Sequence, residues 1–256
     1  MLCSMTWRIA ASLGALVPLA CTVYDTSCKH SRALEPQTAQ VAQGESMRID
    51  VESGSLVVEV VPDLTEVRVS GEACSSDLEQ LSQVELTIEH RDGVLHLASA
   101  FPDISHVGFG LDLVVQMPAG IPVRVKNGSG SISIKGVAGV DIEDGSGSIE
   151  LVDIQGDVRI DDGSGSLSLS GVTGNVWIED GSGSIEVRQV GGSLTVEEDG
   201  SGSIAVESVQ GDVIIMDDGS GSIDVREVGG DFTVDEDGSG DLEFSGVKGR
   251  VTLPDG

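Results

Sequence analysis

The chain has 256 residues, of which only 3% are aromatic, and its 43 acidic and 14 basic residues give a net charge of −29. Nucleic acid and anionic lipid surfaces attract clusters of Lys and Arg, so this charge argues against both as partners and favours cations or basic surfaces. Disorder is also disfavoured, because 39% of the residues are apolar and they recur with a regular period.

Residues 1–20 have the pattern of a signal peptide. Arg8 precedes an apolar run of 12 residues, 9–20, which is too short to span a bilayer. Cys21 follows directly, and the segment resembles a bacterial lipobox, although Pro18 and Leu19 depart from the usual residues. We expect export and lipidation at Cys21, with ordinary cleavage or an uncleaved anchor as alternatives. The expected location is the cell envelope, at the outer membrane or the periplasmic face, with a lipid anchor as the only membrane contact.

The cysteine count predicts one disulfide bond. Of the four cysteines, Cys3 leaves with the signal peptide and Cys21 carries the lipid. Cys28 and Cys74 remain as a pair in an oxidising compartment, so we expect them to be bonded. Residues 21–46 are then the lipidated N-terminus and a polar tether.

Residues 47–126 alternate between apolar and polar side chains in several short runs, but without a fixed period. This pattern predicts an irregular β region or cap. Ser53-Gly54-Ser55-Leu56 echoes the repeat that follows later in the chain. The region therefore reads as an interrupted start of the same structure.

Residues 127–256 are built from a repeat. The tripeptide Gly-Ser-Gly recurs seven times at spacings of 17 to 19 residues, and two short alternating runs follow one another in each unit. A period of this length indicates stacked units. The sequence therefore predicts an all-β fold: a parallel β-solenoid of about seven coils with two short strands per 17–19-residue coil, preceded by the irregular β region.

The inward positions of the repeat stay apolar when the coils are aligned. Five columns emerge, and all 35 positions are apolar. Nearly all of them are aliphatic, as the narrow space between two parallel sheets requires. The last coil contributes Leu242, Phe244, Val247, Val251 and Leu253.

These repeats carry a family resemblance. Units of the form D-G-S-G-S-I-x-V-x-x-V-x-G-D-V-x-I, entered through the turn Pro118-Ala119-Gly120 and preceded by a Cys74-containing strand, resemble the bacterial putative-adhesin family. The resemblance covers roughly residues 47–253. It implies a β-solenoid of the kind often found in envelope lipoproteins, in a domain of unknown function without catalytic residues.

An acidic pair precedes six of the Gly-Ser-Gly turns. The second members of these pairs form one column: Asp144, Asp162, Asp180, Asp199, Asp218 and Asp237. One interpretation is that Asp-Gly is good turn chemistry and that solvated carboxylates discourage aggregation. The other is a weak cation ladder for Ca²⁺, which prefers oxygen ligands. The calcium-binding nonapeptide is not matched, because Gly147 stands where that motif has Asp, so we expect no cofactor beyond weak Ca²⁺ binding.

Catalytic signatures are missing from the sequence. No Lys follows Gly-Ser-Gly-Ser, so the phosphate-binding loop is not matched, and turn geometry accounts for the glycines. His30, His90, His96 and His106 do not have the spacing of metal ligands. We therefore expect a protein that is not an enzyme.

An uncharged outward column crosses the second strand of the coils. Its centre consists of Trp177, Thr195, Ile214 and Thr233, which is unusual in so acidic a chain and marks a candidate partner surface. Alternatively, the tether or an N-terminal strand covers these residues, or they are simply β-formers. An ice-binding face is a minor alternative.

Three functions are compatible with the sequence. The first is an envelope-anchored adhesion or interaction scaffold that binds a protein or a cell-surface component. The second is an acidic surface protein that binds cations. The third is an accessory factor in envelope-stress sensing.

Overall fold

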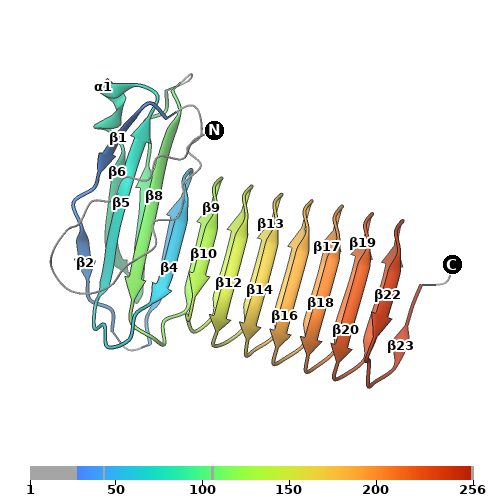
Figure 1. Cartoon of the computed structure of the whole chain (residues 1–256). Helices are drawn as coiled ribbons and strands as arrows, with labels where there is room; N and C mark the ends of the chain where they lie inside the picture. The colour runs from blue at the N-terminus through green and yellow to red at the C-terminus, as the bar shows by residue number, and fades with distance from the viewer. Residues whose placement is uncertain (1–27, 43, 105–106, 255–256) are drawn as a thin grey trace, which may run out of the picture.

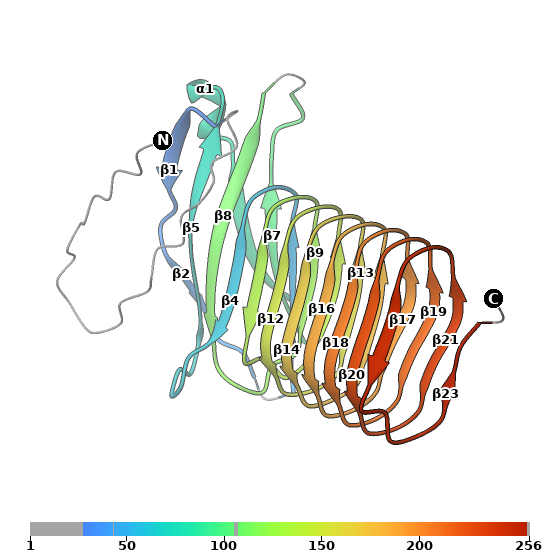
Figure 2. The same cartoon turned by 45° about the vertical axis from the view of Figure 1, so that its right-hand side comes forward.

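The computed structural model describes residues 28–42, 44–104 and 107–254. These residues form a rod in which short strands stack along one axis, with the described N-terminal segment at one end and the C-terminus at the other (Figure 1). In the oblique view of Figure 2, each coil runs up one sheet, turns, and returns through the facing sheet. The prediction of an all-β parallel solenoid behind an irregular β region is confirmed. The signal peptide and Cys21 lie outside the described residues.

The repeats alternate between two sheets. Strands that follow each Gly-Ser-Gly turn form sheet A: β10 (Ile132–Lys135), β12 (Ile149–Ile154), β14 (Leu167–Val172), β16 (Ile185–Val190), β18 (Ile204–Val209), β20 (Ile223–Val228) and β22 (Leu242–Ser245). Strands that precede the turn form sheet B: β9 (Val123–Asn127), β11 (Val140–Asp144), β13 (Val158–Asp162), β15 (Val176–Asp180), β17 (Leu194–Asp199), β19 (Val213–Asp218) and β21 (Phe232–Asp237). The equivalent strand of the last coil, β23 (Val251–Thr252), pairs with β21. Each strand pairs in parallel with the equivalent strand of the next coil.

The five apolar columns form the core between the sheets. In the first six coils every column position is buried, as Ile204, Val206 and Val209 illustrate at 0–2% exposure. The last coil differs from the prediction, because Phe244 and Leu253 are 43% and 41% exposed. No further coil covers them in the described residues. A coil buries its apolar row only against neighbours on both sides, which the last coil lacks.

The irregular region continues the same stack in a different order. Strand β4 (Leu56–Val60) pairs in parallel with β10, and β3 (Ser46–Val51) pairs in parallel with β9. On their other edges lie β8 (Phe109–Met117) and β7 (Val94–Ala100), also in parallel. The chain thus builds the inner coil β3–β4 first and the outer coil β7–β8 later. The echo of the repeat at residues 53–56 is a true member of the stack.

Antiparallel strands close the N-terminal end of the rod. In sheet A, β5 (Val67–Ser75) runs antiparallel to β8, and β1 (His30–Ala33) and β2 (Gln37–Ala39) pair with the outer side of β5. In sheet B, β6 (Glu85–Arg91) pairs antiparallel with β7. The one described helix is the single turn α1 (Leu78–Leu81), capped by the Asp77 side chain. The segment predicted as a tether, residues 21–46, thus contains strands β1 and β2 and the first residue of β3.

The second glycine of each Gly-Ser-Gly turn is required by the stacking distance. Gly202 has φ +155°, and a Cβ placed on it would lie 1.3 Å from the carbonyl oxygen of Gly183 in the coil before. Any side chain would collide with backbone that cannot move without separating the coils. Close approach of the chain explains why this glycine recurs.

The turn opposite Gly-Ser-Gly is stabilised by side chains that hydrogen-bond to the backbone of the next coil. At one position per coil, a side-chain oxygen accepts a hydrogen bond from the backbone N–H of the equivalent residue in the following coil. The series runs from Asp157 through Asn175, Ser193, Asp212 and Asp231 to the N–H of Arg250, with donor–acceptor distances of 2.7–3.1 Å. This side-chain ladder satisfies donors that a turn would otherwise leave unpaired.

Candidate functional site

The six aspartates expected as a cation ladder do not lie on the surface. Asp144, Asp162, Asp180, Asp199 and Asp218 are only 0–6% exposed, and Asp237 is half-buried. They lie in register on neighbouring strands of sheet B and continue a column begun by Asn127, which is 3% exposed. The interpretation of solvated turn carboxylates is therefore wrong for this member of each acidic pair. We call Asn127 with these six residues the aspartate column.

The conformation of the Gly-Ser-Gly turn directs these carboxylates into the rod. The Oδ1 atoms of Asp162 and Asp180 accept hydrogen bonds of 3.2 Å from the backbone N–H groups of Ser164 and Ser182, two residues further on. This contact is the Asx-turn that Asp favours before such a turn. The sequence signal was present in the Asp-Gly-Ser-Gly motif, but it gave no indication that the side chain points into the rod.

Most of the oxygens in the column have no hydrogen-bond partner in the structure. Neither carboxylate oxygen of Asp199 or Asp218 has one, and Oδ2 of Asp162 and of Asp180 also lacks one. An ionised carboxylate in such a place loses its hydration without compensation. Protonation is the simplest relief, because a neutral carboxyl also gains an O–H donor for the next member of the column.

The pKa values in the column respond to this burial. Desolvation is the main cause that raises the pKa of Asp162 to about 6, and the charges of Asp144 and Asp180 add to it. Desolvation, with Asp180 and Asp218 as neighbours, raises the pKa of Asp199 to about 7. Removal of a carboxyl from water disfavours its charged form, and a nearby like charge does so further. The column is therefore partly protonated near neutral pH.

A stack of single carboxylates differs from a metal site. Each coil contributes one buried Asp, and the described part of the chain contains no group of three or more His, Cys, Asp or Glu residues placed to hold a metal ion. Calcium takes six to eight oxygen ligands. The arrangement thus stacks one buried carboxyl per coil, and weak Ca²⁺ binding along the column stays a prediction.

The candidate partner surface lies on the outer face of sheet B. Trp177, Thr195, Ile214 and Thr233 occupy the same register position on β15, β17, β19 and β21, and each is half-exposed. We call these four residues the outer strip. Strands β1 and β2 belong to sheet A, so the described N-terminal strands do not cover the strip. The strip is thus a continuous uncharged path along the rod.

Neighbouring charges partly frame Trp177. Arg159 on β13 forms an ion pair of 3.7 Å with Glu197 on β17, and β15 with Trp177 runs between these two strands. Glu197 is the extra residue of a β-bulge, because Glu179 pairs with Glu198 while Ile178 pairs with Val196. This bulge accounts for the change of period from 18 to 19 residues. An exposed pair of this kind contributes little stability, so it can open for a partner.

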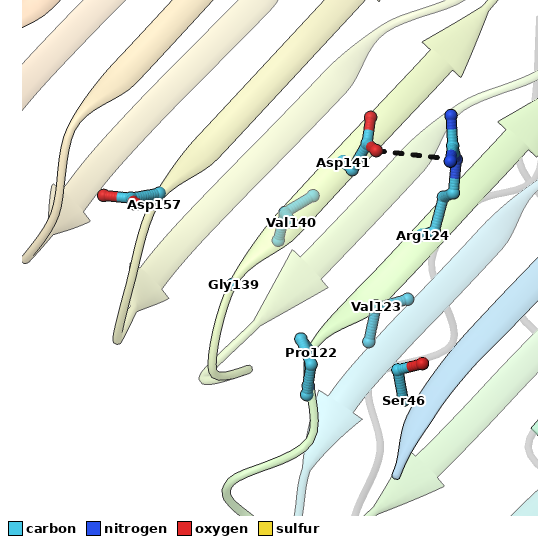
Figure 3. A pocket seen from close by; sticks show the side chains of 8 residues that line it. All are labelled: Ser46, Pro122, Val123, Arg124, Gly139, Val140, Asp141 and Asp157. Carbon is cyan, nitrogen blue, oxygen red and sulfur yellow. Dashed lines mark ion pairs between the residues drawn. The ribbon is translucent and has the colours of Figure 1, made fainter. Parts of the chain in front are cut away.

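A shallow hollow lies next to the same face near the N-terminal end. It has a volume of about 260 Å³ and is lined by Ser46, Pro122, Val123, Arg124, Gly139, Val140, Asp141 and Asp157. Figure 3 shows Arg124 and Asp141 side by side at its rim, where Nε and Oδ2 are 3.5 Å apart. Its basic group is already paired and its walls present few polar atoms. The hollow is thus a poor candidate for a catalytic site.

The cysteine prediction can be compared with the structure in part. Cys28 and Cys74 form a disulfide with Cα atoms 5.6 Å apart, which ties the start of the described chain to β5. None of the described helices is long and apolar enough to cross a membrane.

The chain is similar to solved structures of putative adhesins. A putative adhesin from Bacteroides fragilis shares 13% identity, with a TM-score of 0.42 over 87% of this chain and 97% of that one. A putative adhesin from Parabacteroides distasonis shares 15% identity, with a TM-score of 0.39 over 87% and 97%. A putative cell adhesion protein from Clostridium sporogenes shares 12% identity, with a TM-score of 0.33 over 88% and 99%.

Two of these neighbours, from Bacteroides fragilis and Parabacteroides distasonis, carry the same description as the family that the repeats resemble. No family model matches the chain, and no curated protein matches its sequence.

Proposed function

We propose that this chain is a non-enzymatic interaction scaffold of the cell envelope, which presents the outer strip to a protein or a cell-surface component. The observation that carries the proposal is the strip itself. In a chain of net charge −29, four half-exposed uncharged residues lie on neighbouring strands with Trp177 at one end. Trp is one of the residue types enriched at binding hot spots.

The solenoid suits this role because it holds the strip straight. Every backbone register in the strip is fixed by parallel pairing on both sides, and the core behind it is fully buried. A surface ordered before binding loses little conformational freedom on binding.

Anchoring at Cys21 is part of the proposal. Cys28 lies seven positions after Cys21, and seven extended residues span at most about 25 Å. Because Cys28 is bonded to Cys74, a lipid on Cys21 would hold the closed N-terminal end of the rod near the membrane. The outer strip would then begin several coils away from the bilayer.

The test is a binding assay of the purified protein on cell-envelope preparations. Trp177→Ala should weaken attachment by tenfold or more while the melting temperature stays within about 2 °C. Thr173→Ala, at an exposed turn in the preceding part of the same coil, is the matched control and should not change attachment. If Trp177→Ala melts several degrees lower with attachment intact, the tryptophan only packs against its own chain and the proposal is wrong.

A further inference from the structure

Acidic side chains lie on both sides of the outer strip. Two or three positions after each strip residue, the same strand carries acidic residues that are exposed or half-exposed: Glu179, Glu197, Glu198, Asp217, Asp235 and Glu236. We call these six residues the acidic row. On the other side, Asp212 and Asp231 are exposed two positions before Ile214 and Thr233. The outer strip is therefore an uncharged path between acidic groups.

The fold supplies almost no opposite charge for this face. Strands β15, β17, β19 and β21 contain no Lys or Arg. Among the described residues, only Glu197 of the acidic row is in an ion pair, with Arg159 at 3.7 Å. The outer face of sheet A differs, because there Arg188 forms ion pairs with Glu186 on its own strand and with Glu207 on the next. The face of sheet B thus attracts positive charge from outside the chain.

Parallel stacking holds like charges of the acidic row next to each other. Glu179 lies in register with Glu198, and Asp217 lies in register with Glu236. Like charges directly opposite each other in a sheet are destabilising. A local feature that lowers stability without a gain inside the fold is typical of a functional site.

The same face also offers apolar contact. Trp177 and Ile214 belong to the outer strip, and Met216, which is 45% exposed, follows Ile214 on the same face of β19. Methionine is flexible and is common on surfaces that receive helices. A neutral glycan would gain nothing from the acidic row, and an anionic lipid surface would be repelled by it. The combination selects a partner that carries apolar and basic groups together.

A second copy of this chain does not meet that requirement. On the preceding strands of sheet B, the outward Lys and Arg residues are already in ion pairs. Arg48 pairs with Asp50 at 2.9 Å, and Arg124 and Lys126 pair with Glu143 at 2.9 and 3.4 Å. The same face of another copy therefore supplies no excess positive charge, and two chains of net charge −29 repel each other. The partner is another protein.

The dimensions of the face fit an α-helix. Neighbouring strands lie about 4.8 Å apart, so the four strip residues span about 14 Å along the rod. Acidic groups two residues away on either side, at about 3.3 Å per residue, are about 13 Å apart across it. A helix with its side chains is about 10–12 Å wide, and about ten residues cover the length. Trp177 and Ile214, two coils apart, match the spacing of about 10 Å between residues i and i+7 of a helix.

We propose that the partner of the outer strip is a basic amphipathic helix of another protein. The helix axis lies along the rod. Its apolar side chains contact Trp177, Ile214 and Met216, and Lys or Arg residues on its two flanks pair with the acidic groups on either side of the strip. The inference rests on the proposed function, because it names the class of partner for the same surface.

Tryptophan fluorescence with a synthetic helix tests the proposal. The chain contains two tryptophans, Trp7 and Trp177, so the full-length Trp7→Phe variant reports on Trp177 alone. The probe is an 18-residue peptide of Leu and Lys with its leucines at positions i, i+3, i+4 and i+7. One control peptide distributes the same leucines around the helix, and the other has Glu in place of Lys. The probe should bind at least tenfold more tightly than either control and shift the emission of Trp177 to shorter wavelengths.

Charge variants locate the binding on the acidic row. Glu198→Gln with Asp217→Asn should weaken binding of the Leu–Lys peptide about fivefold or more. The same variant should melt at or above the temperature of the wild type, because it removes repulsion within the sheet. Glu150→Gln with Glu243→Gln removes the same charge from exposed positions of sheet A and is the matched control. It should change the affinity less than twofold.

Three results with the peptides would overturn the inference. The first is binding of the Leu–Lys peptide without a shift of the Trp177 emission. The second is equally tight binding by the peptide with distributed leucines, and the third is an equal loss of affinity in the two charge variants. Each would show that the peptide responds to the charge of the whole chain and not to this surface.

Attachment to cell-envelope preparations separates this inference from the proposed function. Protease treatment of the envelope should abolish attachment, and periodate oxidation of its sugars should not. Attachment that survives protease, or that only periodate abolishes, would rule out the helix. If that attachment still depends on Trp177, the interaction scaffold stands with a different partner. If attachment does not depend on Trp177, the proposed function itself is wrong.

Discussion

The Nδ2 atom of Asn127 donates a hydrogen bond of 2.8 Å to Oδ1 of Asp144. The same nitrogen also donates a hydrogen bond of 3.3 Å to the carbonyl oxygen of Gly130. The first member of the aspartate column thus shows how an amide fits among the buried carboxyls. The Asn127 amide hydrogen-bonds to the turn that follows it and to the neighbouring carboxylate, and it carries no charge.

The aspartate column predicts that the fold loses stability as pH rises. The pKa of Asp199 is raised to about 7 by burial and by its neighbours, against about 3.9 for an unfolded Asp. The folded state binds the proton more tightly, so its stabilising effect is complete below about pH 4 and is lost as pH rises through 7. Asp162 and Asp218, with pKa values of about 6, act in the same direction. Thermal melting between pH 4 and pH 8 measures this trend.

Asp199→Asn isolates one member of the column. The amide can take the place that Asn127 already shows to be acceptable, so the variant should melt higher than the wild type at pH 8 and about equally at pH 4. Glu198→Gln, an exposed change of charge one residue away, should leave the pH dependence nearly unaltered. A variant that is destabilised equally at both pH values would show that Asp199 is needed for its shape and not for its proton.

Stacking distance predicts opposite outcomes for two glycines. Gly202→Ala places a Cβ 1.3 Å from a backbone oxygen of the coil before, so it should cost about 3 kcal/mol or more, or prevent folding. Gly139→Ala meets its nearest atom at 3.4 Å, an ordinary contact, and should change the stability by less than about 1 kcal/mol. Chemical denaturation measures both. Similar losses in the two variants would contradict the close approach of the coils.

The repeat made the solenoid predictable because its columns tolerate few exceptions. Val206 and its equivalents are apolar in every coil, and that regularity fixes which side faces the core. The direction of Asp199 was not predictable, because Asp before a glycine turn can face either water or the interior. The direction of the side chain depends on its hydrogen bond to the turn and on how deeply its position is buried in the coil. Neither can be read from the residue type.

The order of the N-terminal coils could not be predicted from the sequence either. Leu56 pairs with Ile132, although 76 positions separate them, because β7 and β8 are added outside β3 and β4 and not after them. Local patterns show where strands occur, but the pairing of non-neighbouring strands depends on which sheet edge is still free. The exposure of Phe244 and Leu253 was not predicted either, because both residues match the apolar columns and a residue pattern does not show which neighbours cover a coil.

Two adjacent positions on β18 test which face of sheet A points into the core. Val206 is 2% exposed and points into the core, while Ala205 is exposed and lies between Glu186 and Asp224. Val206→Lys should cost about 3–5 kcal/mol, because its charge would be buried without a partner. Ala205→Lys should be neutral or slightly stabilising through its acidic neighbours. Equal melting temperatures for the two variants would contradict the inward assignment of the column.

The side-chain ladder makes the last prediction, which concerns one hydrogen bond. Oδ1 of Asp212 accepts from the N–H of Asp231 at 2.8 Å, and its own N–H is bonded at 3.1 Å to Oγ of Ser193. Asp212→Ala removes the acceptor and leaves an N–H of the next coil unpaired, at a cost of about 1 kcal/mol. Asp212→Asn keeps an oxygen in the same place, as Asn175 does two coils earlier, and should be nearly silent. Denaturant melts of the two variants measure the difference. If both variants lose the same stability, the charge of Asp212 matters and its hydrogen bond to the next coil does not.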